Sequence, residues 1–171
     1  MKENCDKEGL KVDREHVLAL DIATHTGFYS MHESGTWNFT ESKKRNNNKQ
    51  HKDFRDTLIE FIKAHEIVLI VAEDINVNQH FYDMRKLAEF RGILLETCDE
   101  LNLPEPEFVN ISALKKWATG NGMATKLEMI SACINRFNFH PRDDNEADAC
   151  LIYHYYLRKH RIYWNVHIRH Y

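Results

Sequence analysis

The chain has 171 residues, of which 43% are hydrophobic and 29% charged, and it contains only 6 Gly and 3 Pro. This length suits one ordinary domain, and this composition excludes disordered, collagenous and low-complexity proteins. The formal net charge of −3 argues against a protein that coats nucleic acid through a bulk positive field. We therefore expect a single globular domain over residues 1–171.

The sequence shows no sign of a membrane segment or of a disulfide scaffold. Its longest uninterrupted apolar run, at 67–72, is far shorter than the ~20 residues that span a bilayer, and the polar N-terminus lacks the apolar core of a signal peptide. The four cysteines form no C-x-x-C pair. We expect a cytoplasmic protein with reduced thiols and no membrane partner.

The first half of the chain predicts three strands, a loop and a helix. Apolar runs predict a strand over 17–21 and antiparallel neighbours over 27–31 and 35–40. The polar segment 41–52 has no periodicity and predicts a mobile surface loop. Apolar residues at helical spacing over 54–62 then predict an amphipathic helix.

The middle of the chain predicts strands and helices in alternation. The β-branched run 67–72 is too short for a helix and predicts a strand buried on both faces. A long helix over 87–101 and a short strand over 108–111 follow, and then a helix that Ser112 caps and Gly120 closes. Alternation of this kind after antiparallel strands predicts an α/β fold around one mixed sheet.

The last third predicts two helices and a final strand. Thr125 caps a helix, and Asp143 with Glu146 resembles the capping box of another that runs to about Lys159. Apolar and polar residues then alternate over 161–169 and predict an extra C-terminal strand. An exposed apolar strand is an aggregation liability, so we expect it to add to a sheet edge or to pack across a subunit interface.

Three acids occupy positions that usually hold apolar or neutral residues. Asp148 shares a helical face with Leu151 and Ile152, so it points toward the sheet and must be paired or bound to a metal. Asp21 and Glu73 each end an apolar strand, and neighbouring strands would bring their carboxyls within about 5 Å. Oxygen ligands without Cys or His favour Mg²⁺ or Mn²⁺, and two such ions would promote phosphodiester hydrolysis.

Two further acids lie beside these three. Asp144 lies one turn before Asp148 on the same side of the helix and could extend the cluster. Asp74 follows Glu73 directly, so strand alternation turns it toward the other face of the sheet. Each acid alone is weak evidence of function, but the order strand Asp, strand Glu, helix Asp is hard to obtain by accident.

Five motifs in order resemble the RuvC-type Holliday junction resolvases of the ribonuclease H-like superfamily. Over residues 16–157 they read LALDIATHTGF, VAED, FRG, TGNGMATK and DDNEADA. The resemblance implies a ribonuclease H-like mixed five-stranded sheet flanked by helices, a divalent-metal endonuclease, four-way DNA junctions as substrates and a homodimer. It also implies that Asp21, Glu73 and Asp148 are metal ligands and that Lys126 lies near the scissile phosphate.

The chain departs from the family pattern at three places. Family members often carry Pro-Gly after the first Asp, where this chain has Ile22 and Ala23. Family members often carry Asp or His three residues before the last Asp, where this chain has Asn145, so Asp144 becomes the alternative fourth ligand. An aromatic residue that inserts near the crossover often follows the second acid closely, and this chain has Asn76 there. Phe81 or Tyr82 could serve in its place.

Basic residues elsewhere are candidates for contacts with DNA phosphates. They are Lys43, Lys44, Arg45, Lys115, Lys116 and Lys126. Two rival functions stay open on the sequence: a ribonuclease H-like nuclease that acts on RNA or other branched DNA, and a catalytically silent relative that only binds nucleic acid.

Overall fold

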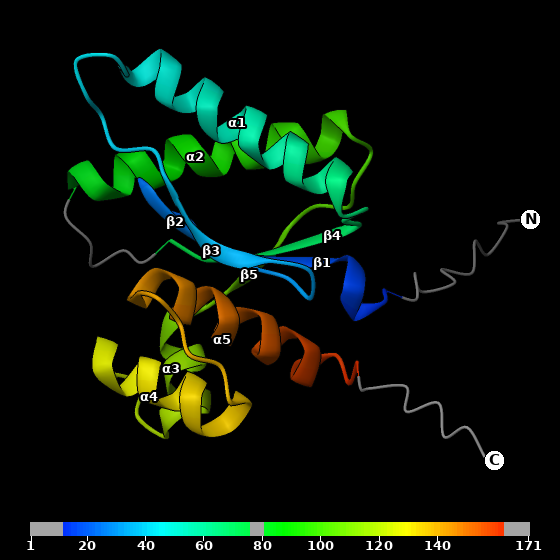
Figure 1. Cartoon of the computed structure of the whole chain (residues 1–171), viewed down its shortest axis with the longest axis vertical. Helices are drawn as coiled ribbons and strands as arrows, with labels where there is room; N and C mark the ends of the chain where they lie inside the picture. The colour runs from blue at the N-terminus through cyan, green and yellow to red at the C-terminus, as the bar shows by residue number, and fades with distance from the viewer. Residues whose placement is uncertain (1–11, 76–80, 163–171) are drawn as a thin grey trace, which may run out of the picture.

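A computed structural model of the chain describes residues 12–75 and 81–162 (Figure 1). The elements run in the order 3-10 turn Arg14–His16, β1 Val17–Asp21, β2 His25–Tyr29, β3 Ser34–Asn38, α1 Asn47–Ala64, β4 Leu69–Glu73, α2 Phe81–Glu100, β5 Glu107–Val109, α3 Ile111–Thr119, α4 Lys126–Phe137 and α5 Asp144–Lys159. Among these described elements, no helix combines the length and apolar character needed to cross a membrane.

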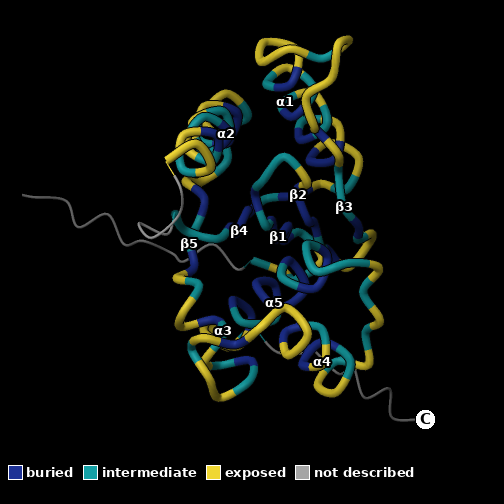
Figure 2. The backbone as a smooth tube through the Cα atoms, turned by 90° about the vertical axis from the view of Figure 1, so that its left-hand side faces the viewer, coloured by how far each residue is buried: buried dark blue, intermediate teal, exposed yellow. Residues whose placement is uncertain are grey.

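One mixed five-stranded sheet organises the fold, as the sequence predicts. Its strand order is β3-β2-β1-β4-β5, which Figure 2 shows edge-on. The pairs β1–β2 and β2–β3 are antiparallel, whereas β1–β4 and β4–β5 are parallel. The two central strands, β1 and β4, therefore run side by side and end at the same edge of the sheet.

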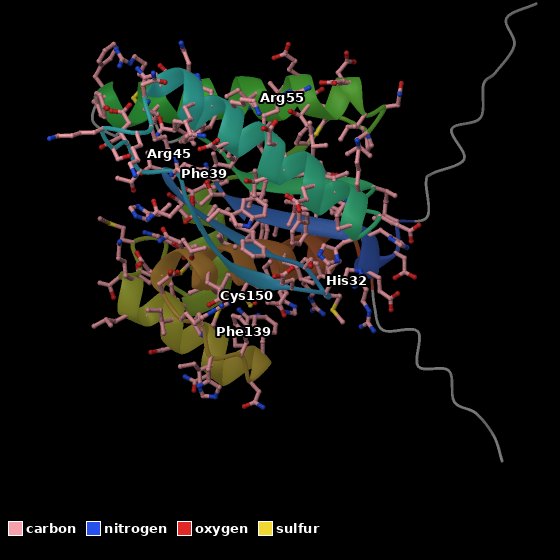
Figure 3. All side chains as sticks on the ribbon, turned by 45° about the horizontal axis from the view of Figure 1, so that its top comes forward. His32, Phe39, Arg45, Arg55, Phe139 and Cys150 are labelled. Atoms are coloured by element: carbon pink, nitrogen blue, oxygen red, sulfur yellow. The ribbon has the colours of Figure 1, made fainter. Side chains whose placement is uncertain are left out.

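The sheet separates two hydrophobic cores because successive side chains of a strand point to opposite faces. In β1, Leu18 belongs to the core that contains Phe39, beneath α1 and α2. Ala19, its neighbour, belongs to the core that contains Cys150, beneath α3, α4 and α5. Figure 3 labels Phe39 and Cys150 on the two sides of the sheet. The helix pair α1–α2 and the helix trio α3–α5 thus enclose the sheet between them.

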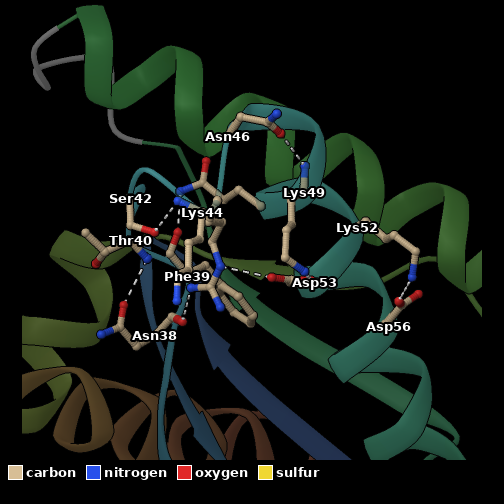
Figure 4. Close-up of polar contacts among 12 residues, drawn as sticks. Asn38, Phe39, Thr40, Ser42, Lys44, Asn46, Lys49, Lys52, Asp53 and Asp56 are labelled. Carbon is tan, nitrogen blue, oxygen red and sulfur yellow. Dashed lines mark hydrogen bonds and ion pairs between the residues drawn. The ribbon is translucent and has the colours of Figure 1, made fainter.

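Helix α1 begins earlier than the sequence predicts, so the expectation of a mobile loop over 41–52 is wrong for its second half. The Asn46 side chain caps the helix by accepting a hydrogen bond from the Lys49 backbone amide at 3.0 Å, and Lys49 pairs with Asp53 at 3.0 Å (Figure 4). Gln50 is fully buried, and its side-chain amide donates to the Phe39 carbonyl. Polar contacts therefore stabilise the start of α1, and they leave no apolar periodicity in the sequence from which this part of the helix could be predicted.

Helix α2 begins at Phe81, six residues before the predicted start at 87, and other element boundaries differ by one or two residues. β2 ends at Tyr29 instead of continuing to 31, because the Ser30 amide donates to the Glu33 carbonyl at 2.9 Å and closes a turn. The cap of α3 is Asn110 and not Ser112; its side chain accepts from the Ala113 amide at 3.0 Å.

Several predicted helix ends are confirmed. Gly120 ends α3 in the left-handed region at φ 84°, and Thr125 forms a capping box with Glu128 at the start of α4. Asp143 caps α5 by accepting from the Glu146 amide at 2.8 Å. The expected C-terminal strand lies almost wholly at 163–171, outside the described residues.

Candidate active site at the ends of β1 and β4

The site begins with the two acids that end the central strands. The parallel register pairs Leu20 with Ala72, so the next residues, Asp21 and Glu73, follow at the same level of the sheet. Strand alternation points both side chains toward the face that α5 covers, since Ala19 of β1 lies in that core. The structure therefore brings together two carboxylates that are 52 positions apart in the sequence.

Helix α5 brings the third acid to the same place. Its first turn lies directly against β2, because a Cβ built on Gly27 would lie only 2.0 Å from the backbone oxygen of Asn145. Gly27 is the pairing partner of Asp21, so this contact sets the N-terminal end of α5 at the level of the strand acids. Asp148 lies one turn further along, on the face of α5 that packs against the sheet.

Burial and neighbouring charges raise the pKa values of all three carboxyl groups. Burial raises the pKa of Asp21 well above its usual range, and the charges of Glu73 and Asp148 and a side-chain hydrogen bond with Glu73 raise it further. Burial and the charge of Asp148 raise the pKa of Glu73 to about 7. Burial raises the pKa of Asp148 to about 6, although the nearby Lys115 ammonium opposes the shift. Such mutual elevation is the signature of crowded carboxylates.

The chemistry of these groups suits a divalent cation. The Oδ1 atom of Asp148 is buried and has no hydrogen-bond partner, so it is an oxygen that a cation could ligate. All three groups supply hard oxygen donors of the kind that Mg²⁺ and Mn²⁺ prefer. In the described conformation no group of three or more His, Cys, Asp or Glu side chains is already arranged as a metal site. Asp21 and Glu73 share their hydrogen bond instead, and Asp144 pairs with Lys126.

Two of the predicted basic residues lie beside the acids. Lys126, at the start of α4, forms an ion pair with Asp144, and its side chain is 79% exposed. The charges of Asp148 and Asp21 also raise its pKa, although less than Asp144 does. Lys115 of α3 lies close enough for its charge to lower the pKa of both Glu73 and Asp148. Lys116 is exposed on the same helix.

The remaining predicted DNA contacts lie on the other face of the sheet. Lys43 and Lys44 are exposed on the loop before α1. Arg45, in contrast, binds within the protein: it pairs with Asp53 at 2.9 Å and donates to the Asn38 carbonyl at 2.8 Å (Figure 4).

The two candidate aromatic residues stand at the start of α2. Phe81 is 80% exposed and Tyr82 is 57% exposed. In Figure 1 this end of α2 lies on the left, at the same side of the molecule as the starts of α1, α4 and α5 and the end of β1. The aromatic residues and the acids therefore share one side of the protein.

One residue beside the site, Arg91, is not indicated by the sequence. Arg91 of α2 forms an ion pair with Asp74, and its guanidinium lies 3.5 Å from the ring centre of Phe108 in β5. The Asp74 amide also donates to the Val109 carbonyl at 2.9 Å. Asp74 thus turns toward α2, as strand alternation predicts. The ion pair with Arg91 and the backbone hydrogen bond to Val109 hold it in place next to Glu73. The FRG motif contains Arg91, but nothing in the sequence alone indicates its partner.

Comparisons with solved structures find this fold in Holliday junction resolvases. RuvC of T. thermophilus in complex with a Holliday junction substrate aligns with a TM-score of 0.67 and 16% identity, over 85% of this chain and 96% of that chain. A second RuvC structure from Thermus thermophilus aligns with a TM-score of 0.65, 16% identity and the same coverage. The yeast mitochondrial Holliday junction resolvase Ydc2 aligns with a TM-score of 0.58 and 13% identity, over 88% and 82% of the two chains.

No protein-family model and no curated sequence matches the chain. The likeness to these solved structures is therefore one of three-dimensional arrangement. The chain has the ribonuclease H-like fold of the RuvC and Ydc2 resolvases.

Proposed function

We propose that this protein is a divalent-metal-dependent endonuclease that hydrolyses phosphodiester bonds in branched DNA, with the four-way junction as its substrate. The observation that carries the proposal is the convergence of Asp21, Glu73 and Asp148, with the buried Oδ1 atom of Asp148 left without a partner. Three carboxylates in such a place are costly for stability unless a cation separates them. A structural role alone does not account for them.

In this proposal the acids hold two Mg²⁺ or Mn²⁺ ions, with Asp144 as a fourth ligand. When bound, such ions activate a water molecule and stabilise the leaving oxygen of an in-line displacement. Asp144 must first leave its ion pair with Lys126, and the released ammonium is then free to contact the scissile phosphate. Lys115, whose charge acts on Glu73 and Asp148, would hold a neighbouring phosphate.

The choice of substrate rests on the fold and on the surface around the acids. A structural neighbour was solved in complex with a Holliday junction substrate. The exposed cations Lys43, Lys44 and Lys116 could position DNA arms, and Phe81 or Tyr82 could insert where base pairs open. A four-way junction offers two symmetry-related scissile phosphates, so we further propose a two-fold homodimer.

The decisive experiment compares four labelled substrates in Mg²⁺ and in Mn²⁺: a four-way junction, a linear duplex, a flap and an RNA–DNA hybrid. We expect cleavage of the junction, with Asp21→Asn, Glu73→Gln and Asp148→Asn each losing at least about a hundredfold in single-turnover rate. Junction binding should persist or tighten in these variants, because they remove negative charge and no phosphate contact. The exposed Asp99 supplies the control, and Asp99→Asn should cleave like the wild type.

Other results of this four-substrate experiment would indicate one of the two rival functions. Cleavage of the RNA–DNA hybrid in place of the junction would make the protein a ribonuclease H-like nuclease on RNA. Junction binding without cleavage, together with no heat of Mn²⁺ binding in calorimetry, would make it a silent relative. The oligomeric mass in solution, measured by light scattering, tests the homodimer separately.

A further inference from the structure

Exposed apolar side chains gather on two sides of the candidate site. In the described part of the chain, the large hydrophobic residues that are exposed number five: Met31 at 38%, Phe81 at 80%, Tyr82 at 57%, Met123 at 87% and Leu127 at 76%. Phe81 and Tyr82 begin α2, which covers one face of the sheet, and Met123 and Leu127 precede and begin α4 on the other face. The strand acids lie at the sheet edge between them.

The exposure of Met123 and Leu127 is fixed by the local structure. The Met123 amide donates to the Asn121 side chain at 3.0 Å, and the Asn121 amide donates to the Thr119 hydroxyl at 3.1 Å. Gly120 turns the chain in the left-handed region, where other residues are strained. The Met123 side chain therefore projects from an ordered turn.

The first turn of α4 is equally well held. The Thr125 amide donates to the Glu128 carboxylate at 2.6 Å, and the Glu128 amide donates to the Thr125 hydroxyl at 3.3 Å. Ala124 and Met129, on either side of this capping box, are both buried in the core beneath α5. With those two residues inside, Leu127 is left outside on the opposite side of the turn.

The cation between these apolar residues connects them to the acids. Lys126 directly precedes Leu127, and its ammonium pairs with Asp144 at the start of α5. The charges of Asp148 and Asp21 reach the same ammonium. Met123 and Leu127 thus lie on either side in sequence of a basic residue whose charge interacts with the acids of the site.

We propose that Met123 and Leu127 form an apolar wedge that packs against unstacked bases at the branch point of the DNA while Lys126 holds the adjoining phosphate. Apolar side chains of this kind insert at base steps and stabilise unstacked DNA, and cations beside them fix the backbone. A lysine next to the wedge suits a polyanion that carries flat apolar groups, which is the chemistry of a nucleic acid. This inference rests on the proposed function, since it assigns a second contact on the same substrate.

The wedge makes branched DNA a better ligand than linear duplex. Bases at a junction are already partly unstacked, so inserting an apolar side chain there requires little further disruption of base stacking. In a continuous duplex the same insertion must first break a stacked step. Phe81 and Tyr82 offer a comparable surface on the opposite side of the acids. The two surfaces together would hold a branch point open across the site.

The test uses four-way junctions that carry 2-aminopurine beside the branch point, in Ca²⁺ so that cleavage does not interfere. The wild type should raise 2-aminopurine fluorescence on binding, and the double variant Met123→Ala/Leu127→Ala should lose most of that rise. Junction affinity should fall about tenfold or more in the double variant, whereas affinity for linear duplex should fall less than about threefold. Met31→Ala, at the turn between β2 and β3, removes an exposed apolar side chain far from α4 and should match the wild type.

Two further variants keep the result interpretable. Met123→Leu/Leu127→Met preserves the apolar surface and should restore the fluorescence, whereas Met123→Gln/Leu127→Gln keeps side-chain size and should not. Equal fluorescence and affinity in the wild type and the double alanine variant would overturn the wedge, as would an equal loss on duplex and junction. A wild type that neither binds nor cleaves branched DNA would overturn the proposed function first, before any wedge variant is compared.

Discussion

The backbone carbonyl of Asn145 occupies the space in which a side chain on Gly27 would begin. A Cβ at Gly27 would lie 2.0 Å from that oxygen and 2.4 Å from its carbon, far inside any van der Waals contact. Gly27 pairs with Asp21 in the sheet. The depth to which α5 sinks onto the sheet, and hence the approach of Asp148 to Asp21, thus depends on a residue with no side chain.

Gly27→Ala should push the first turn of α5 away from the sheet. We expect a loss of about 3 kcal/mol or more in the free energy of unfolding, since the clash is with backbone and cannot be relieved by a rotamer change. Urea unfolding measures this loss. Gly92→Ala is the control: a Cβ there meets nothing within 4 Å, so inside α2 it should be neutral or stabilise by up to about 1 kcal/mol.

The folded metal-free protein should become less stable as pH rises from about 4 to about 7. Burial and neighbouring carboxylates raise the pKa of Glu73 to about 7 and that of Asp148 to about 6, so these carboxyls bind more protons in the folded state than in the unfolded state in that window. Burial lowers the pKa of His154 to about 4, which acts in the opposite direction, but the raised carboxyls, Asp21 included, outnumber it. The stabilisation is complete below the ordinary carboxyl pKa and is lost as pH rises through the folded values. Thermal unfolding in chelator across pH 4–8 measures it.

Neutralising one acid should remove much of this dependence. At pH 8 without metal, Asp21→Asn should be more stable than the wild type by roughly 1–3 kcal/mol, because it removes a buried carboxyl whose ionisation is opposed by burial and by the charges of Glu73 and Asp148. At pH 4 the two proteins should be alike. Millimolar Mn²⁺ should stabilise the wild type at pH 8 and should stabilise Asp21→Asn much less. A wild type whose stability rose over pH 4–7 in chelator would contradict the crowded-carboxylate arrangement.

Much of the site could be predicted because it depends on regular periodicity. Strand alternation and the ends of apolar runs are local properties, so the positions of Asp21 and Glu73 follow from the sequence once β1 and β4 are neighbours. The helical face of Asp148 follows in the same way from Leu151 and Ile152. The close approach of α5 to β2 could not be predicted, because the sequence does not show that the Asn145 backbone packs against Gly27.

Polar interior contacts account for most of what the sequence did not indicate. The start of α1 depends on buried Gln50 and on a cap at Asn46, and neither gives an apolar periodic signal. From the sequence, Arg45 is a candidate for a phosphate contact. In the structure the first turns of α1 place Asp53 beside it, and the two side chains form an ion pair. The role of Arg91 likewise becomes apparent only from its contact with Asp74, which lies 17 residues away in the sequence and outside α2.

The pair formed by Arg91 and Asp74 should support the end of β4. Arg91→Gln removes an ion pair and a cation–π contact with Phe108, so we expect a loss of about 1–2 kcal/mol in unfolding free energy and weaker Mn²⁺ binding through the adjacent Glu73. Calorimetric titration with Mn²⁺ and urea unfolding measure the two effects.

The control for Arg91 is Arg55 on the neighbouring helix α1, a residue that Figure 3 labels. Arg55 pairs with Glu100 at the far end of α2, so Arg55→Gln breaks a comparable pair remote from the acids. It should cost less than about 0.5 kcal/mol and leave Mn²⁺ affinity unchanged. Asp74→Asn combined with Arg91→Gln should be little worse than Arg91→Gln alone, because both act on one contact. Fully additive losses would show that the two side chains act independently.

Lys86 should be the residue of α2 whose charge most affects stability. Its side chain is 6% exposed, and its ammonium donates at 2.8 Å to both the Asn47 and the Gln50 side-chain oxygens, with Glu41 at 3.3 Å. Lys86→Met keeps the apolar stem but leaves the side-chain oxygen of the buried Gln50 without this donor, so we expect a loss of roughly 2–4 kcal/mol. Urea unfolding measures it, with Lys52→Met as control, since the Lys52 pair with Asp56 is exposed and should contribute less than about 0.5 kcal/mol.

The same contact holds the loop that carries Lys43 and Lys44, because Glu41 and Asn47 bound it on both sides. Limited trypsin digestion under native conditions should therefore cut after these lysines several-fold faster in Lys86→Met than in the wild type. The rate in Lys52→Met should stay at the wild-type value. If Lys86→Met unfolded at the same urea concentration as the wild type and resisted trypsin equally, Lys86 would be a bystander, and the order of this loop would have to come from Arg45 and its contacts with Asp53 and Asn38.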